Sequence, residues 1–321
     1  MRRLTLKQLE TIRAVAQAGT IVLASEKLNV TPAALTSRIK LLEEDAGLAL
    51  FDRCSGRLRL TAAGEEVVNA ARRVDLVLNE LDSTFTAIRG MRAGRISVGV
   101  VSTAKYFAPR LIAAFARVNP RIEVTISVGN RAEMVTQLRD YSIDVGLMGR
   151  PPMDFPIESE AFGPHPQVVI AAPDHPLATR RSIDKTELTN ESFIVREEGS
   201  GTRSIFEYFF SNVVVRQPRI SIEIGSNETI KQAVIAGLGI ALISAHTIEA
   251  EVESGRLVVL DVKGLPIIRQ WFIVRRADRP FSPIGQAMWN FTLAEGPKLL
   301  PKLIEPWQAK PAEKPPAEPS S

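Results

Sequence analysis

Three stretches of the sequence place hydroxyl, amide and charged side chains where a predicted strand turns into a predicted helix. They are "VVSTAKYFAPR" (100–110), "REEGSGTRS" (196–204) and "GSNETIK" (225–231). The first N–H groups of a helix have no carbonyl partner in the preceding turn, so a helix start attracts anions. The candidate residues for binding a small anionic metabolite are Ser102, Thr103, Lys105, Ser200, Thr202, Arg203, Asn227, Glu228 and Thr229.

Ordinary helix capping also explains each of these turns, because Ser, Thr and Asn cap helices whether or not a ligand binds. Ser102 and Thr103 would cap a predicted helix at 107–118, and Ser226 or Asn227 would cap another. One such turn alone would favour plain capping. Three of them in one chain, two with a nearby cation, favour an anionic metabolite.

Catalysis and metal binding have little support in the sequence. Its three histidines (165, 175 and 246) are far apart, and it contains no HExxH motif, nucleophile elbow or P-loop. The single cysteine, Cys54, excludes an internal disulfide and a cysteine zinc site, which indicates a reducing cytoplasm. "GLGI" (237–240) ends a predicted helix, so we interpret it as a helix C-cap rather than a dinucleotide fingerprint. We expect no metal and no cofactor.

Strands alternate with helices from residue 95 onward. Strands are predicted at 95–101, 122–129, 144–149, 167–172, 192–197, 219–225, 240–244 and 269–275, and helices at 107–118, 132–141, 202–213 and 228–237. This alternation is typical of a parallel α/β domain. Crossings near 163–168 and 266–271 predict two lobes, like those of periplasmic binding proteins, with a ligand cleft between them. Lobe I would span about 92–165 and 269–295, and lobe II about 166–268.

The first 61 residues predict a different, mainly helical domain. Apolar residues at three- and four-residue steps indicate helices at 6–17, 20–28 and 31–46, and "LFDRCSGRLRLT" (50–61) alternates like a small hairpin. Three helices with a tight turn before the third, followed by a basic hairpin, are typical of an all-α winged helix-turn-helix.

The third predicted helix, within "NVTPAALTSRIKL" (29–41), has two unlike faces. Thr31 and Pro32 start it, and Leu35, Ile39 and Leu42 fall on one side. The other side carries only slim or polar residues, namely Ala33, Thr36, Ser37 and Lys40. Such a helix is either an ordinary amphipathic surface helix or one shaped to enter a DNA groove.

Charge is unevenly distributed along the chain. The first 60 residues hold ten Lys or Arg and six Asp or Glu, so the whole formal net charge of +4 arises there, and the remainder is balanced. A nucleic-acid partner explains this excess, although a solvated basic face explains it about equally well.

A long helix is predicted from about 61 to 91. Seven of its apolar residues recur at alternating steps of four and three, which is typical of a coiled-coil seam: Val67, Ala71, Val74, Leu78, Leu81, Phe85 and Ile88. The alternative is one face of a helical bundle. We favour a seam with a second copy of the chain, because two-fold dimers are the commonest oligomers, and we interpret 62–91 as a linker and dimerisation helix.

The totals agree with a globular protein of several domains. The chain has 321 residues, of which 45% are hydrophobic, and it lacks an apolar run of the roughly 20 residues that span a bilayer. We therefore expect no membrane partner. The Pro-rich stretch 296–321 is predicted to be disordered.

The sequence from Leu4 to Arg53, followed by "RLRLTAAG" (57–64), strongly resembles the DNA-binding end of LysR-type transcriptional regulators, and the resemblance extends to about residue 295. Within that family, "DVGLMGRPP" (144–152), "VREEGSGTRS" (195–204) and "EIGSNETIKQAVIAGLGIALISAHT" (223–247) resemble the CbbR group, which regulates Calvin-cycle operons that include RuBisCO genes.

The resemblance implies a non-enzymatic transcriptional activator in the bacterial cytoplasm, associated with the nucleoid. Its implied partners are double-stranded operator DNA, RNA polymerase, and further copies of itself as a homodimer and dimer of dimers, that is, a homotetramer. The implied effector is a phosphorylated Calvin-cycle metabolite or NADPH. The DNA-binding residues that the resemblance implies are Thr31, Pro32, Ala33, Thr36, Ser37, Arg38 and Lys40 in the recognition helix, and Arg53 and Arg57 in the wing.

The chain departs from the family pattern where the recognition helix opens. A Gln-Pro pair is common there, but Pro32 and Ala33 occupy this start, so a glutamine cannot read adenine. DNA shape should then carry more of the specificity. Two alternatives stay open: a LysR-type regulator of another metabolic operon, and a metabolite-binding protein or enzyme without a DNA function.

Overall fold

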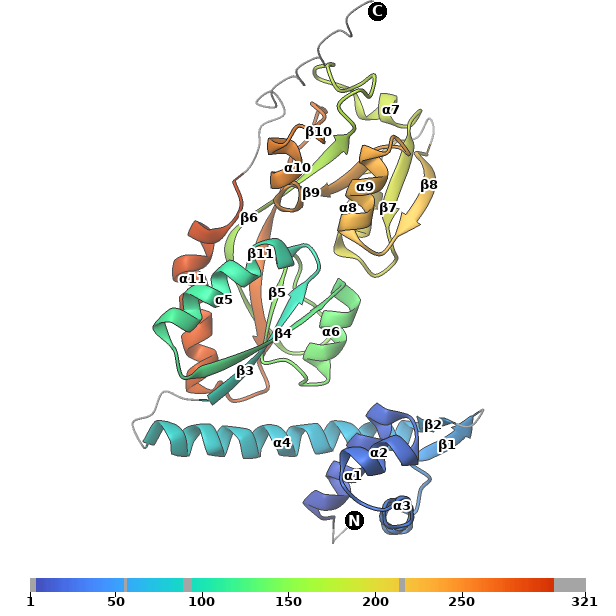
Figure 1. Cartoon of the computed structure of the whole chain (residues 1–321), viewed down its shortest axis with the longest axis vertical. Coiled ribbons are helices and arrows are strands. Elements are labelled where there is room, and N and C mark those ends of the chain that lie inside the picture. Colours follow the sequence, from blue (N-terminus) through green and yellow to red (C-terminus); the bar gives the residue numbers. More distant parts are fainter. Residues whose placement is uncertain (1–3, 55–56, 89–93, 214–216, 303–321) are drawn as a thin grey trace, which may run out of the picture. The chain divides into compact units, whose positions relative to one another are not determined.

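A computed structural model describes residues 4–54, 57–88, 94–213 and 217–302. The chain forms two compact units, Met1–Ile88 and Arg89–Ser321, which we describe separately (Figure 1). Most of the predicted linker at 90–95 and of the Pro-rich tail lies outside the described residues. Among the helices of the described residues, none is long and apolar enough to cross a membrane.

The first unit contains the predicted helices and hairpin. Its elements are α1 (Leu6–Ala18), α2 (Ile21–Lys27), α3 (Pro32–Ala46), β1 (Phe51–Cys54), β2 (Arg57–Leu60) and α4 (Ala62–Ile88). Thr31 caps α3 by accepting a hydrogen bond from the Ala34 N–H at 3.2 Å. Gly47 ends α3 with φ 67°, a left-handed conformation that favours glycine. The winged helix-turn-helix prediction is confirmed.

The apolar side of α3 holds this unit together. Leu35, Ile39 and Leu42 are buried, and Leu42 packs in one cluster with Leu9 and Ile12 of α1. Glu43 lies one turn after Ile39 on α3. Its carboxylate accepts hydrogen bonds from the backbone N–H groups of Leu50 and Phe51 at 2.8 and 3.3 Å. These contacts fix the wing hairpin relative to α3.

The predicted seam along α4 divides into two parts. Val67 and Ala71 are buried against Leu9 and Ile12 of the same chain, and Val74 packs against this cluster. The first half of the seam is therefore intramolecular, which corrects our assignment of Val67 and Ala71 to a contact between chains. Leu78, Leu81 and Phe85 stay exposed, by 43%, 48% and 50%, and the side chain of Ile88 lies outside the described residues.

The second unit is built on a mixed sheet. Its strands are β3 (Gly94–Val101), β4 (Ile122–Gly129), β5 (Val145–Met148), β6 (Ile157–Ala171), β7 (Ser192–Arg196), β8 (Arg219–Ile224), β9 (Ala241–Ser244), β10 (Val258–Val259) and β11 (Ile267–Arg276). Its helices are η1 (Ala104–Tyr106), α5 (Ala108–Val118), α6 (Arg131–Arg139), α7 (Lys185–Leu188), α8 (Gly201–Phe210), α9 (Asn227–Ile235), η2 (Ala245–Thr247), α10 (Glu249–Glu253) and α11 (Pro283–Leu299). The larger sheet has the order β10-β6-β11-β5-β3-β4, with β9 also paired to β6.

Our prediction of a parallel domain is only partly right. β3 pairs in parallel with β4 and β5, and β7 with β8, but β6 and β11 form a long antiparallel pair. The segment 157–166, not predicted as a strand, forms the first part of β6. These two strands run through both predicted lobes and include the crossings expected near 163–168 and 266–271.

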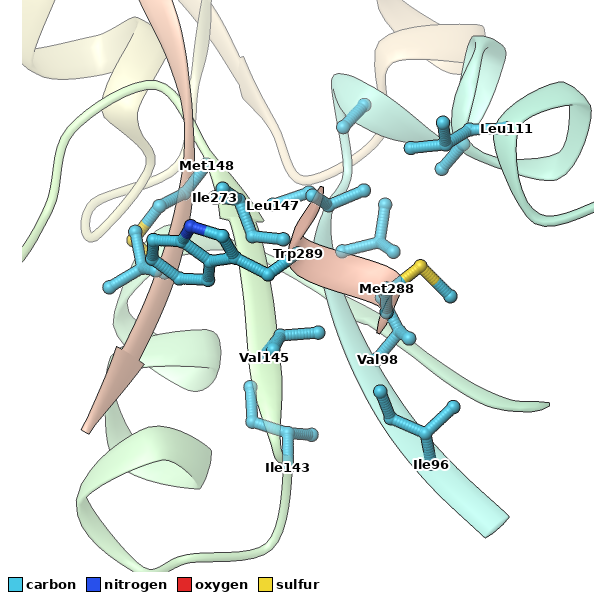
Figure 2. Packing of buried hydrophobic residues seen from close by; sticks show 14 of the residues in the cluster. Ile96, Val98, Leu111, Ile143, Val145, Leu147, Met148, Ile273, Met288 and Trp289 are labelled. Atoms are coloured by element: carbon cyan, nitrogen blue, oxygen red, sulfur yellow. The ribbon is translucent and has the colours of Figure 1, made fainter. Parts of the chain in front are cut away.

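Each lobe has its own core. In lobe I, residues of β3, β5 and β11 pack with α5 and α11 through side chains such as Val98, Leu111 and Trp289 (Figure 2). In lobe II, Phe193 and Val195 of β7 pack against α8, while Ile194 between them packs against α9. Successive side chains of a strand point to opposite faces, so α8 and α9 cover opposite sides of β7.

The end of the second unit also differs from prediction. α11 continues to Leu299, through Pro297, so residues 296–299 are helical rather than part of a disordered tail. Phe162 of β6 packs against Gly296, where a Cβ would lie 2.8 Å from the phenyl ring. This contact ties the last turns of α11 to lobe I.

Candidate functional site

A cavity of about 140 Å³ lies between the two lobes of the second unit. Its floor and walls come from the ends of β3, β5 and β7, the crossing strands β6 and β11, and the starts of α6 and α8. The lining residues are Val101, Ser102, Thr103, Arg131, Ala132, Gly149, Arg150, His165, Arg196, Gly199, Ser200, Gly201, Thr202, Ser204, Ile205 and Arg269.

The start of α8 is one polar wall of this pocket. Ser200 caps the helix by accepting a hydrogen bond from the Thr202 N–H at 3.2 Å, and both residues are buried. Gly199 turns the chain into the helix with φ 80°. The helix is ten residues long, and its first N–H groups together with the helix dipole favour an anion at this wall.

Three arginines from three different parts of lobe I also line the pocket. They are Arg131 of α6, Arg150 after β5 and Arg269 of β11. Burial, and then the charges of Arg150 and Arg269, lower the pKa of the Arg131 guanidinium. Burial and Arg150 likewise lower the pKa of Arg269. No Asp or Glu is among the described residues that line the pocket, although the Asp154 carboxylate outside the lining acts on Arg131. An anionic ligand would add the negative charge that the lining lacks.

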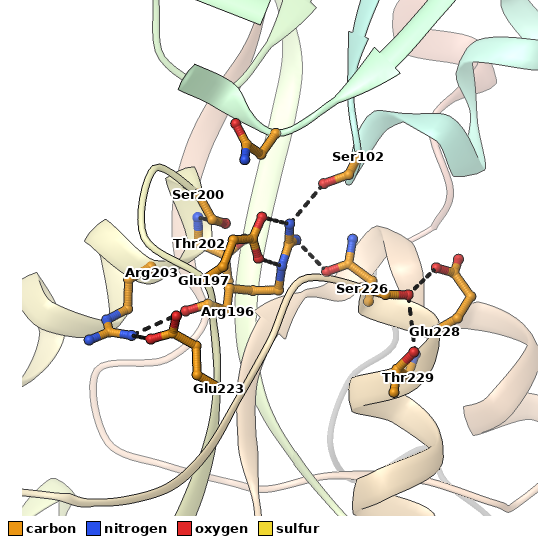
Figure 3. Close-up of polar contacts among 12 residues, drawn as sticks. Ser102, Arg196, Glu197, Ser200, Thr202, Arg203, Glu223, Ser226, Glu228 and Thr229 are labelled. Atoms are coloured by element: carbon orange, nitrogen blue, oxygen red, sulfur yellow. Dashed lines mark hydrogen bonds and ion pairs between the residues drawn. The ribbon is translucent and has the colours of Figure 1, made fainter. Parts of the chain in front are cut away.

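Arg196 behaves differently from these three, although it also lines the pocket. Its buried guanidinium binds the Glu197 carboxylate at 2.7 and 2.8 Å. It also donates to Asn227 Oδ1 at 2.7 Å and to Ser102 Oγ at 3.2 Å (Figure 3). Its charge is thus compensated within the chain, and its role is to join Ser102 of lobe I to lobe II.

The structure brings four of the nine predicted effector residues to the pocket: Ser102, Thr103, Ser200 and Thr202. Ser102 and Thr103 do not act as predicted, because neither caps α5. Thr103 precedes the short helix η1 without a side-chain cap, and α5 starts after Phe107, also without one. Both residues therefore line the pocket without capping a helix.

The other five predicted residues are outside the pocket lining. Lys105 pairs with Glu228 at 2.7 Å, and the Tyr106 hydroxyl donates to the same carboxylate at 2.5 Å. Burial alone would raise the pKa of Glu228, but hydrogen bonds from Lys105 and Tyr106 lower it to about 2. Our assignment of Lys105 and Glu228 to ligand binding is not supported, because the two residues neutralise each other.

Arg203, Asn227 and Thr229 are also engaged elsewhere. Arg203 donates to Glu223 at 2.8 Å, away from the pocket (Figure 3). It also donates to Glu207 at 2.7 Å. Asn227 is fully buried beside Arg196, and the Thr229 N–H donates to the Ser226 cap at 3.4 Å. The start of α9 is an ordinary capped helix, as our alternative explanation held.

Sequence analysis missed the three arginines that give the pocket its charge. Arg131 had a local signal, because it lies between the predicted strand at 122–129 and the predicted helix at 132–141. Arg150 follows a predicted strand, "DVGLMG", in the same way. Arg269 had no such signal, because only the pairing of β11 with β6 brings it to the pocket.

In the first unit, the outer side of α3 is open to solvent. Thr31, Pro32, Ala33, Thr36, Ser37 and Lys40 are exposed, as is Arg57 of the wing, and Arg38 is half-buried. The Thr36 hydroxyl donates to the Pro32 carbonyl at 2.8 Å, so it meets a base edge only as an acceptor. The side chain of Arg53 lies outside the described part of the structure.

A groove runs beside this face of α3. It lies between α2, α3 and the wing, and its lining includes Thr36, Lys40 and Arg57. A narrow helix face with cations at its edges is the arrangement that helix-turn-helix proteins present to the major groove of DNA.

Two family models match the chain. "Bacterial regulatory helix-turn-helix protein, lysR family" matches residues 6–65, and "LysR substrate binding domain" matches residues 89–297. The chain belongs to the LysR family of bacterial transcriptional regulators. Within this LysR-type regulator, the groove beside α3 lies in the region of the first model, and the arginine-lined pocket in that of the second.

Two curated relatives match nearly the full length of this LysR-type chain. "HTH-type transcriptional regulator CbbR" of Rhizobium meliloti (strain 1021) is 52% identical, over 96% of this chain and 99% of its own. The "RuBisCO operon transcriptional regulator" of Allochromatium vinosum is 41% identical, over 92% of this chain and 97% of its own.

Two solved structures share the fold. The regulatory domain of Synechocystis PCC6803 CcmR in complex with 2-PG is 38% identical, with a TM-score of 0.60, and covers 62% of this chain and 96% of its own. Full-length CbnR complexed with target DNA is 21% identical, with a TM-score of 0.65, and covers 91% of this chain and 99% of its own. The second comparison supports the fold alone.

Replacing Lys40 with alanine is expected to weaken binding to all DNA sequences alike, because an exposed lysine at the rim of α3 contacts phosphate rather than a base edge. The slope of log affinity against log salt should fall by about one unit. Fluorescence anisotropy across a salt series measures both quantities. Lys298→Ala, which removes the same charge from the second unit, is the control, and a loss confined to one base position would contradict the phosphate contact.

Proposed function

We propose that this LysR-type regulator activates the transcription of a RuBisCO operon in response to a small anionic metabolite. The observation that carries the operon assignment is the 52% identity to a CbbR protein, which spans both the DNA-binding unit and the effector-binding unit. The name of the Allochromatium vinosum relative also refers to the RuBisCO operon. Such a regulator acts in the cytoplasm, where operator DNA and RNA polymerase are found.

The pocket supports an anionic effector. Three arginines and the start of α8 line the same pocket, and both favour negative charge. A phosphorylated acid satisfies both, and the related Synechocystis domain was solved with 2-PG. NADPH is the second effector class to test, because its phosphates carry the same charge.

The outer side of α3 is the proposed DNA reader. Thr31, Pro32, Ala33, Thr36 and Ser37 would approach base edges, while Arg38, Lys40, Arg53 and Arg57 would contact the backbone. Because no glutamine opens the helix and the Thr36 hydroxyl donates inward, direct base readout is limited. Two-fold spacing and DNA shape should contribute much of the specificity.

The exposed half of the α4 stripe is the proposed contact with a second copy. Leu78, Leu81 and Phe85 follow each other on one side of the helix, and exposed apolar stripes of this kind mark interaction surfaces. A dimer would give the DNA-binding unit two copies for the two half-sites of an operator. A dimer of dimers requires a further contact between the second units.

Leu81→Asp is expected to break this dimer, because the contact would bury an unpaired carboxylate. We expect a monomer in sedimentation analysis and a loss of operator affinity of at least about 100-fold, since half-sites would then bind singly. Leu238→Asp, at an exposed leucine of the second unit, controls for the added charge. A dimeric Leu81→Asp protein with normal operator affinity would contradict this role of α4.

An electrophoretic shift tests the proposed function. The DNA upstream of the RuBisCO operon should shift at protein concentrations at which scrambled DNA of the same length does not. Ribulose bisphosphate, phosphoenolpyruvate, ATP, NADPH and 2-PG are then added in turn, and at least one should alter the mobility or affinity of the complex. Specific binding to another operon, with no response to these ligands, would indicate a regulator of a different pathway.

A further inference from the structure

His165 is a buried histidine on the pocket wall with one unused nitrogen. It lies on β6, is 5% exposed, and its Nε2 is 3.0 Å from the Ser244 hydroxyl. Its Nδ1 has no hydrogen-bond partner within the described part of the chain. A buried nitrogen without a partner costs about 1–3 kcal/mol, so a ligand that supplies the missing partner gains affinity.

The lack of a side chain at Gly149 makes room for the His165 ring. A Cβ on this glycine would lie 2.7 Å from Nδ1 of His165, too close for an ordinary contact. Gly149 also lines the pocket, between His165 and Arg150. Nδ1 is buried in the empty pocket, so a ligand oxygen reaches it only when this turn moves.

Apart from the histidine itself, every charged residue in the described lining of the pocket is an arginine. Arg269 of β11, Arg150 after β5 and Arg131 of α6 are in the same lining, and Arg196 of β7 is neutralised by Glu197. Burial first, and then His246 and Arg269, lower the pKa of His165 well below its usual 6.5. His165 is therefore neutral in the empty pocket at pH 7.

Its other neighbours do not compete for a proton. The His246 ring accepts a hydrogen bond from the Trp271 indole at its Nδ1, at 3.0 Å, and burial lowers the pKa of His246 to about 4. The His165 ring stacks on Trp271, with 3.7 Å between ring centroids. Stacking on Trp271 and the contact with Ser244 hold the ring, so its orientation does not depend on the proton.

We propose that an anionic effector enters this pocket together with one proton, which His165 takes up from solvent. In the charged ring both nitrogens donate, Nε2–H to the Ser244 hydroxyl and Nδ1–H to an oxygen of the anion. The hydrogen bond from Nδ1–H to the anion offsets part of the burial penalty on the imidazolium, and the charge of the anion offsets the repulsion from Arg269. This inference rests on the proposed function, because it requires the pocket to bind an anion.

Proton uptake makes the affinity depend on pH in a defined direction. The free protein has neutral His165 and the complex has the charged form, so affinity rises as pH falls through the pKa of the complex. Full uptake of one proton corresponds to a tenfold change in affinity per pH unit. A phosphate group in the ligand also titrates in this pH range, so it makes the affinity depend on pH by itself. A variant without His165 shows the contribution of the ligand alone.

Calorimetry on the full chain tests the proposal. The tightest binder among ribulose bisphosphate, phosphoenolpyruvate, ATP, NADPH and 2-PG is titrated at pH 7.5 in buffers of different ionisation enthalpy, which gives the number of protons taken up. The titration is repeated at pH 6.5 and 8.5 with wild-type protein, His165→Asn and His175→Asn. Asparagine keeps a donor near the Nδ1 position but does not titrate, and His175 lies outside the pocket lining.

On binding the ligand, wild type and the His175→Asn protein should each take up about half a proton or more in excess of the uptake by the His165→Asn protein. Between pH 6.5 and 8.5 their affinity should fall about tenfold more than that of the His165→Asn protein. Gly149→Ala keeps His165 but places a Cβ against Nδ1, so it should lose the same proton uptake. This variant replaces His165→Asn in the test if the His165→Asn protein does not fold. Equal proton uptake in wild type and His165→Asn would overturn the proposal while leaving the proposed function intact. If none of the five ligands binds the wild type, the proposed function fails and this inference with it.

Discussion

Reversing the charge of Arg269 is expected to abolish the response to the effector. Arg269→Glu removes one of three cations from the pocket and leaves a carboxylate facing the anion. A hydrogen bond to a charged group contributes about 1.5–3 kcal/mol, so we expect the affinity for the effector to fall by at least about 100-fold. Calorimetry with the ligand that binds wild type most tightly measures this loss.

The control for Arg269→Glu is Arg256→Glu. Arg256 is exposed, and its Nε donates to Ser254 Oγ at 3.2 Å, away from the pocket lining. This variant has the same net charge as Arg269→Glu and should bind the effector as wild type does. If the two variants bound equally well, the pocket between the lobes would not be the effector site.

Truncating Trp271 is expected to cost about 3–5 kcal/mol of the free energy of unfolding of the second unit, the range for a buried Trp to Ala change. The side chain is fully buried, stacks on His165 and donates to His246 at 3.0 Å. Its ring also packs edge-on against Phe107, with 5.0 Å between centroids. Trp271→Ala therefore leaves a cavity at the junction of the two lobes and removes the partner of His246.

Urea denaturation followed by far-ultraviolet circular dichroism measures this effect. Trp271→Phe keeps the stacked ring but not the indole donor, so it should cost clearly less than Trp271→Ala. Tyr208→Ala, at an aromatic residue that is 73% exposed, should change the free energy of unfolding by no more than about 0.5 kcal/mol. An equal cost for Trp271→Ala and Tyr208→Ala would show that the junction does not stabilise the unit.

The parts of the fold that the sequence predicted well are those that local chemistry determines. α3 begins at Pro32 and ends before Gly47 as predicted, because a Thr-Pro start and a left-handed glycine are local signals. The "GLGI" stretch is the predicted helix end, with Gly237 at φ 77°. In each case the deciding residues are neighbours in the chain.

The errors concern contacts between distant parts of the chain. A 3.5-residue repeat shows which side of α4 is apolar but not what covers it, and α1 of the same chain covers Val67 and Ala71. The first part of β6, "IESEAFGPHP", lacks a strand-like pattern and is a strand because it pairs with β11. Register across a sheet is a long-range property that a single sequence does not reveal.

The same distinction explains the candidate site. Ser200 and Thr202 were predicted because the cap of α8 is local, and both line the pocket. Arg203, their neighbour, pairs with Glu223 of β8, whose position depends on the fold of lobe II. Arg269 reaches the pocket only through the pairing of β11 with β6. The capped starts of α8 and α9 were thus predictable, whereas the cations that complete the pocket were not.

The measurement that tests the account most directly is a DNase I footprint on the DNA upstream of the RuBisCO operon, with and without the ligand that binds most tightly. Wild type should protect a partly two-fold symmetric site, and the ligand should change the length or strength of that protection. Arg269→Glu should protect the same site without responding to the ligand. Wild-type protein that protects no specific site there, or that protects it identically with and without every ligand tested, would contradict a metabolite-responsive regulator of this operon.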